Sequence, residues 1–175
     1  VSGTNDVALS NVTNGGTINA ASLVGALTVT EAAGSTSDLT VVGGSDDLSV
    51  TGTAALAETL EVTGGAGDDT IDGSAEDAGT DSLTAFGEAG DDTITGGDAA
   101  DTLDGGAGDD AINGDEGADS ITTGGGSDTV TMVSAEDGDT ITDFVMGTDM
   151  LVLTGAAGAA VDLSATTPTA GVYAI

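Results

Sequence analysis

GEAGDDTIT, from Gly87 to Thr95, and GGAGDDAIN, from Gly105 to Asn113, show the pattern that decides the fold. Each nine-residue unit begins with small residues, has Asp in its sixth place and carries an aliphatic residue in its eighth. Units in this register begin at residues 64, 76, 87, 96, 105, 114, 123 and 134. A flexible acidic linker has no reason to keep an aliphatic residue at one phase, so the repetition predicts a repeat architecture.

The order of residue types within a unit has a physical meaning. Glycines permit left-handed backbone angles, and a loop bent in this way can direct several carbonyl oxygens at one centre. The sixth-place Asp adds a carboxylate oxygen to that set. Ligands that are all oxygen suit a hard cation such as calcium.

The unit resembles the GGxGxDxUx nonapeptide of the repeats-in-toxin (RTX) proteins, in which U is a large aliphatic residue. The chain is also similar to alphaproteobacterial surface-layer proteins, which are rich in Thr, Ala and Gly, poor in Lys, free of Cys and carry RTX repeats. The resemblance implies an all-β fold, a right-handed parallel β-roll or β-solenoid with calcium-binding loops, in which two nonapeptides form one turn. It also implies several bound Ca²⁺ ions and type I secretion from a Gram-negative bacterium.

Carried over by position, the resemblance assigns calcium-ligating carboxylates to the sixth-place residues. They are Asp69, Asp81, Asp92, Asp101, Asp110, Asp119, Asp128 and Asp139. Loop carbonyls are expected around Gly87, Gly90, Gly96, Gly105, Gly106, Gly108, Gly114, Gly117, Gly124 and Gly126. Partners two units apart should stack, which pairs Asp92 with Asp110, Asp101 with Asp119, and Asp110 with Asp128. The units at 76 and 134 depart from the pattern, so sites that use Asp69, Asp81 or Asp139 are expected to be distorted or empty.

The stretch from Val1 to Thr63 lacks the glycine loops but keeps an aliphatic period. Longer and shorter steps alternate from Val29, through Val41, Val50, Val62 and Ile71, and the next longer step reaches Leu83. Two successive steps make one coil, so the pattern predicts one continuous solenoid. We expect solenoid coils without regular calcium loops over residues 1–63, a calcium-binding roll over 64–142, and a closing segment with a C-terminal arm over 143–175.

The segment ITDFVMGTDMLVL, from Ile141 to Leu153, looks like the closing segment of the family. Phe144 is expected to plug the core, and Leu151 and Leu153 to continue a strand. Residues 154–175 fit an extra strand, an assembly arm or part of a secretion signal. Unpaired edge strands near Val1 and the arm near Tyr173 are candidate contacts with neighbouring molecules.

Composition narrows the function further. The chain has 31 acidic residues and no Lys, Arg or His, so cations must relieve the repulsion, and folding should be coupled to calcium binding. Without Cys, calcium takes the place of disulfides in an extracellular protein. Without cationic side chains, nucleic acid is an unsuitable partner, and we expect no enzymatic activity in the absence of His, Cys and Lys. No apolar run is long enough to span a membrane.

Three functions fit these observations. The preferred one is a calcium-dependent extracellular structural protein that self-associates into a surface layer or matrix filament. The second is an accessory module that helps an attached enzyme, toxin or adhesin to fold after secretion. The third is recognition of a repeating surface, such as ice, by rows of outward hydroxyls. These rows comprise Ser82 with Thr84, Ser120 with Thr122, and Thr140 with Thr142.

Overall fold

The computed structural model describes residues 6–13, 15–32, 37–52, 59–75, 81–132, 138–154 and 162–163. Outside this part lie the N-terminal residues 1–5, portions of the units that begin at 76 and 134, and most of the expected C-terminal arm with Tyr173. The described residues form 16 strands and no helix, so they contain no helix able to cross a membrane.

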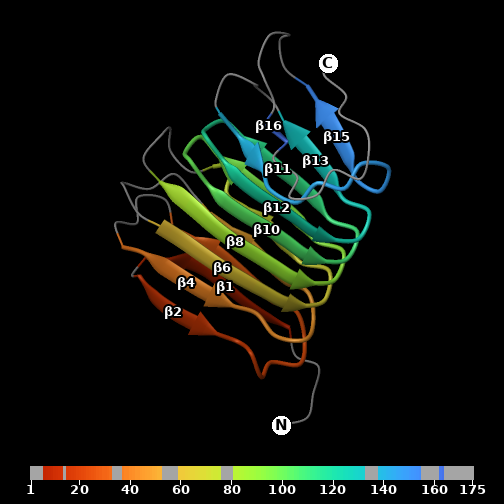
Figure 1. The fold of residues 1–175 in the computed structure, drawn as a ribbon. Coiled ribbons are helices and arrows are strands. Elements are labelled where there is room, and N and C mark those ends of the chain that lie inside the picture. Colours follow the sequence, from red (N-terminus) through yellow and green to blue (C-terminus); the bar gives the residue numbers. More distant parts are fainter. Residues whose placement is uncertain are drawn as a thin grey trace.

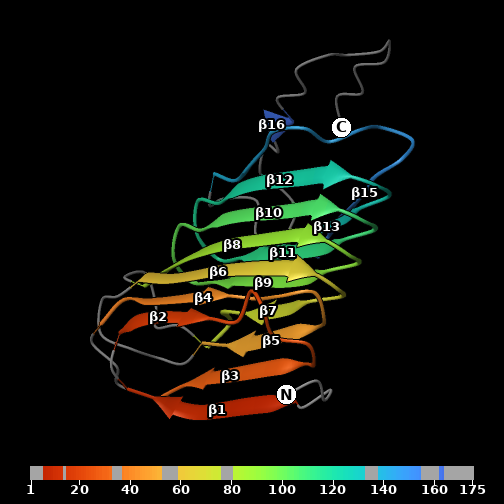
Figure 2. The same ribbon diagram turned by 90° about the horizontal axis from the view of Figure 1, so that it is seen from below.

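The strands form two eight-stranded parallel sheets (Figures 1 and 2). Each coil of the chain adds one strand to each sheet, and successive coils stack on one another. One sheet contains β1 (Val7–Val12), β3 (Leu27–Glu31), β5 (Leu48–Thr51), β7 (Thr70–Asp72), β9 (Thr93–Gly97), β11 (Ala111–Asp115), β13 (Thr129–Met132) and β15 (Met150–Leu153). The other contains β2 (Gly16–Asn19), β4 (Leu39–Val42), β6 (Thr59–Ala66), β8 (Ser82–Ala89), β10 (Thr102–Ala107), β12 (Ser120–Gly125), β14 (Thr140–Ile141) and β16 (Asp162–Leu163). We call these the odd sheet and the even sheet. The predicted all-β parallel solenoid is confirmed.

The core lies between the two sheets, because alternate side chains of each strand point inward. One aliphatic side chain per strand forms a column across each sheet, with neighbours paired in register. In the odd sheet this column contains Val29, Val50, Ile71, Ile94, Ile112 and Val130, all at most 1 % exposed. Phe144 is buried against the end of this core, as expected for the closing segment.

The register corrects two details of the sequence interpretation. Leu83 pairs with Leu60 rather than with Val62, and Ala85 takes the place beside Val62. The coil is therefore longer here than the coils before it, because Ala85 and Phe86 extend the chain between two units. The hydroxyl rows shift for the same reason. Thr84 lies beside Thr102, which in turn lies beside Ser120 rather than Thr122.

Candidate metal centre

The sixth-place carboxylates lie inside the roll. Each of these eight Asp residues directly precedes a strand, and none is more than 7 % exposed. The aliphatic residue two places further on points into the core, so the Asp side chain points to the same side of the strand. The loops therefore bring acidic side chains into the space between the sheets, where an ionised carboxylate is costly unless a cation accompanies it.

Hydrogen bonds stack these carboxylates from coil to coil. The backbone N–H of Asp92 donates to Oδ1 of Asp110 at 2.8 Å, and that of Asp110 donates to Oδ1 of Asp128 at 2.9 Å. On the other edge of the roll, the N–H of Asp101 donates to Oδ1 of Asp119 at 2.9 Å. The three stacked pairs predicted from the spacing of two units are thus present. Two further bonds extend these two ladders, from Asp69 to Asp92 at 2.7 Å on the first edge and from Asp119 to Asp139 at 3.0 Å on the second.

The second oxygen of five of the stacked carboxylates has no hydrogen-bond partner in the protein. This holds for the buried Oδ2 atoms of Asp69, Asp92, Asp101, Asp110 and Asp128. Burial raises the pKa of Asp69, Asp92, Asp101 and Asp110 to about 6, although a backbone N–H donor partly offsets the rise. Burial also raises the pKa of Asp128. A row of buried, unsatisfied anionic oxygens is unfavourable by itself and becomes favourable with a bound cation.

In the five units that begin with glycine, this first-place residue leaves room for the carboxylate oxygen. A Cβ placed on Gly105 would lie 2.5 Å from Oδ2 of Asp110 and 2.6 Å from the carbonyl oxygen of Thr123 in the next coil. The same crowding by an Asp Oδ2 recurs at Gly64, Gly87, Gly96 and Gly114. A carboxylate oxygen and a backbone carbonyl oxygen therefore border one small space in successive loops. This donor chemistry fits Ca²⁺, which takes six to eight oxygen ligands.

Carboxylates alone cannot complete such a site. Within the described part of the chain, no three acidic side chains converge in a way that could hold a metal ion. Most ligands would therefore be backbone carbonyls of the glycine loops, as the repeat pattern predicts.

Comparison with known families supports this interpretation. The model of the RTX calcium-binding nonapeptide repeat matches in four copies, over residues 61–83, 77–112 and 104–131. The chain carries RTX calcium-binding repeats. Such repeats bind several calcium ions per array and form a non-catalytic calcium-binding module. No curated protein and no solved structure matches the chain.

Leucine replaces the carboxylate in the coils that precede the RTX array. The N–H of Leu48 donates to Oδ1 of Asp69 at 2.7 Å, so Leu48 and Asp69 occupy the same position in successive coils. The Cδ2 atom of Leu48 lies 3.2 Å from the Cβ position of Gly43, where Asp69 presents Oδ2 to Gly64. In the even sheet, Leu83 and Asp101 share a position in the same way, with a bond of 2.8 Å. In each sheet, one column of side chains thus changes from leucine to aspartate.

In the even sheet, Asp81 lies outside the column of positions that the other predicted ligands occupy. Leu83 holds the position that Asp101 takes one coil later, and Asp81 lies two places before it. Asp81 is buried but is not aligned with the RTX carboxylates that follow.

Asp149 joins the RTX ladder, although the nonapeptide pattern misses it. The N–H of Asp128 donates to its Oδ1 at 3.2 Å, so Asp149 continues the stack of the odd sheet. Its Oδ2 accepts the N–H of Val145 at 2.7 Å, so both oxygens have protein partners. Nearby, Asp143 accepts the N–H groups of Thr123 and Gly124 at 2.7 and 2.8 Å. The short motif Gly-Thr-Asp, with an aliphatic residue two places after the Asp, is the sequence signal for Asp149.

The RTX glycines serve two separate purposes. First-place glycines are needed for space, whereas several second-place and fourth-place glycines are needed for positive φ. Gly90, Gly106, Gly108, Gly117 and Gly124 have φ between 94° and 151°. Glu88 and Asp115 occupy second places with φ of 78° and 71°, where a residue with a side chain is strained.

A second ladder runs along the outside of the same loops. Exposed fifth-place carboxylates accept the backbone N–H of the following coil. Asp91 accepts the N–H of Asp109 at 2.9 Å, and Asp109 accepts that of Ser127 at 2.8 Å. These bonds run opposite to those of the buried ladder. They hold adjacent loops in register without a buried charge.

Proposed function

We propose that calcium binding to the stacked loops folds this chain into a rigid extracellular rod, which serves as a subunit of a surface layer or matrix filament. The observation that carries the proposal is the row of buried Oδ2 atoms that have no protein partner. The Oδ2 atoms of Asp69, Asp92, Asp101 and Asp110 each lie beside a first-place glycine whose Cβ position would also meet a carbonyl oxygen of the next coil. A bound cation would compensate these anionic oxygens, and the sequence contains no Lys, Arg or His side chain that could do so.

We assign the ions to the stacked pairs. Asp92 with Asp110, Asp110 with Asp128, and Asp101 with Asp119 are the best supported, because each pair is joined by a hydrogen bond between carboxylate and backbone. Asp69 and Asp139 extend the two edges of the stack. Asp81 is the least supported, because Leu83 occupies its place in the column.

Electrostatics links binding to folding. The 31 acidic residues have no basic partner in the sequence, so the folded roll concentrates negative charge. Each Ca²⁺ ion adds two positive charges where the carboxylates are closest. The chain would therefore stay unfolded where calcium is scarce and fold outside the cell. This behaviour suits type I secretion, and affinities of about 10⁻⁴ to 10⁻³ M are typical of extracellular modules.

The proposed division of the chain into regions follows the change from leucine to aspartate at the position shared by Leu48 and Asp69. We propose that residues 64–142 form the calcium-dependent roll, that 1–63 form coils packed mainly by leucine and valine, and that 143–175 close the structure. Protease digestion at millimolar calcium and in chelator would test this division. Cleavage that moves into 64–142 on chelation supports it, and equal protection of that region in both conditions contradicts it.

The structural role has its own experiment. Circular dichroism during a calcium titration reports folding, and electron microscopy of the same samples reports assembly. Calcium-dependent sheets or filaments are the expected result. Folded but separate rods at every protein concentration would contradict the structural subunit and favour the accessory module. A chain that folds equally well in chelator would contradict the calcium dependence.

A second function is supported by the outer face of the odd sheet. Two columns of mostly hydroxyl side chains cross it, with Thr28, Ser49, Thr70, Thr93 and Thr129 in one and Thr30, Thr51, Thr95 and Thr131 in the other. Neighbouring strands are about 4.8 Å apart and alternate residues about 6.6 Å, so the hydroxyls form a regular array. Such a face could bind a repeating surface such as ice. Loss of ice shaping in Thr93→Tyr, with calcium folding retained, would support this function, and no ice shaping by the unaltered protein would contradict it.

A further inference from the structure

Exposed large apolar side chains gather at the two ends of the described solenoid. Leu9 and Val24 are 36 % and 58 % exposed in the first coil. Val145, Met146, Met150 and Leu153 are each at least 50 % exposed in and beside the last coil. In the described coils between them, every large apolar side chain is at least partly buried. Apolar surface of this kind, confined to opposite ends, indicates contact surfaces rather than scattered exposure.

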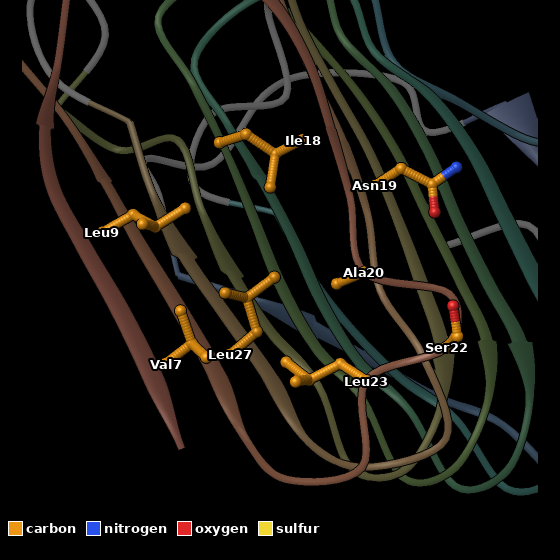
Figure 3. A pocket seen from close by; sticks show the side chains of 8 residues that line it. All are labelled: Val7, Leu9, Ile18, Asn19, Ala20, Ser22, Leu23 and Leu27. Atoms are coloured by element: carbon orange, nitrogen blue, oxygen red, sulfur yellow. The ribbon is translucent and has the colours of Figure 1, made fainter. Parts of the chain in front are cut away.

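The first coil presents an open apolar hollow (Figure 3). Its volume is about 370 Å³, and its apolar lining includes Val7, Leu9, Ile18, Leu23 and Leu27. The residues that complete the lining are uncharged as well. The hollow is the exposed cross-section of the core, which the next coil would cover if the solenoid continued.

Both ends also present unpaired strand edges. In the described structure β1 pairs only with β3, and β2 only with β4, while β15 and β16 are the last strands of the two sheets at the other end. Each end therefore offers one edge strand of each sheet. Because all pairings are parallel, the last coil of one copy can be followed by the first coil of another in the same direction.

The register of the columns is compatible with such a junction. Leu151 continues the column of Val130, and Leu9 begins the column of Val29. With the same register across the junction, Leu151 would lie beside Leu9 of the next copy. Leu153, which pairs with Met132, would lie beside Val12. Apolar side chains would thus meet apolar side chains at the junction.

Charge favours the ends over the sides. Two copies that each carry a formal charge of −31 repel one another. One edge of the roll carries the exposed acidic ladder of Asp47, Asp68, Asp91 and Asp109, which opposes lateral contact there. The lining of the N-terminal hollow carries no charge, so the acidic C-terminal end of a second copy meets no acidic side chain in it.

We propose that the N-terminal end of the solenoid, formed by β1, β2 and the hollow, is the docking site for the C-terminal end of a second copy. The inference rests on the proposed structural function, because it specifies the contact through which subunits join. A head-to-tail contact that continues the stacking of coils along one axis does not close into a ring and therefore produces a filament. The junction completes both sheets and covers the open core.

End-blocked variants test the proposal. Leu9→Asp places a charge in the hollow, and Leu153→Asp places one at the opposite end. Ser45→Asp adds the same charge at an exposed position between β4 and β5 and is the matched control. Sedimentation velocity at millimolar calcium is expected to show long oligomers for the unaltered protein and for Ser45→Asp, and monomers for each end-blocked variant alone. A mixture of the two end-blocked variants is expected to form dimers and nothing longer, because one open head and one open tail remain.

The dimers in the mixture also show that both variants are folded. Dimers formed by Leu153→Asp alone would indicate contact between two N-terminal ends and would overturn the head-to-tail proposal. Continued assembly of both end-blocked variants would place the contact on the sides, and would overturn this inference while leaving the structural function intact. Calcium-folded but monomeric unaltered protein would overturn both. If such a monomeric protein formed oligomers after removal of residues 164–175, the chain's own C-terminus would be what covers the end of the solenoid. The proposed contact with a second copy would then be wrong.

Discussion

Replacing Asp110 by Asn should have opposite effects on stability with and without calcium. Asp110 is buried, its Oδ1 accepts the N–H of Asp92 at 2.8 Å, and its Oδ2 has no protein partner. Asparagine keeps the size of the side chain and the accepting oxygen but removes the charge. Asp109→Asn is the matched control, because Asp109 also accepts a backbone N–H at 2.8 Å, from Ser127, while remaining exposed.

The magnitude follows from the pKa of Asp110. Burial raises this pKa from 3.8 to about 6, and each unit corresponds to about 1.4 kcal/mol. Ionised Asp110 therefore disfavours the calcium-free fold at pH 7.5 by at most about 3 kcal/mol, which solvent screening at the loop reduces to about 1–2 kcal/mol. Asp110→Asn should recover this amount in chelator. With calcium, loss of an anionic ligand that serves two stacked sites should weaken binding by about 10- to 100-fold, a cost of about 1.4–2.7 kcal/mol per site.

Two titrations measure these effects. Refolding by an osmolyte in chelator gives the stability of the calcium-free fold, and calcium titration followed by circular dichroism gives the calcium midpoint. Asp110→Asn should refold at lower osmolyte concentration than Asp109→Asn yet need more calcium. At pH below about 4 its advantage in chelator should vanish, because Asp110 is then protonated in both states. A variant that matches Asp109→Asn in both titrations, or is weakened in both, would refute the buried calcium ligand.

Three further predictions follow from the loops. In chelator, stability should fall as the pH rises from about 4 to about 6, because Asp69, Asp92, Asp101 and Asp110 have raised pKa values and oppose folding when ionised. Thermal unfolding in chelator at several pH values measures this, and a rise in stability over the range would contradict it. Glu88→Gly and Asp115→Gly should each stabilise the calcium-loaded protein by about 1 kcal/mol, because both residues have positive φ. Unchanged or lower melting temperatures would count against that strain. Gly105→Ala should destabilise the roll by about 1–3 kcal/mol, since its Cβ would meet Oδ2 of Asp110 and the Thr123 carbonyl. Gly125→Ala, with nothing within 4 Å of its Cβ, is the control, and equal urea midpoints for the two variants would contradict this crowding.

Much of the fold could be predicted because two independent signals repeat with the same period. The glycines and Asp of each unit mark the loops, and the aliphatic residue two places after the Asp marks the inward side of the strand. Stacking of Asp92 on Asp110 follows from the length of a two-unit coil alone. A spacing rule of this kind needs only that each turn of the solenoid repeats the one before.

The errors arose where a coil changes length. The alternation of longer and shorter steps led to Leu83, but Ala85 supplies the side chain beside Val62. Leucine and alanine both point inward from β8, so the pattern could not decide which of them continues the column. Asp149 was missed for a related reason, because its loop has the Gly-Thr-Asp ending without the preceding glycines. In both places hydrogen bonding between coils fixes the register, and the pattern within one unit does not.

The column shared by Leu48 and Asp69 shows how calcium dependence can be built into a solenoid. At Gly43 the space is filled by a leucine methyl group, and at Gly64 the equivalent space holds a carboxylate oxygen. The backbone hydrogen bonds and the flanking aliphatic column are the same in both coils. Leucine stabilises its coil under all conditions through burial, whereas an ionised aspartate there destabilises the coil until a cation binds. On the proposal that calcium binding and folding are coupled, the residue type at this one position sets whether a coil can fold without calcium. In the RTX array, aspartate occupies this position on both edges of the solenoid.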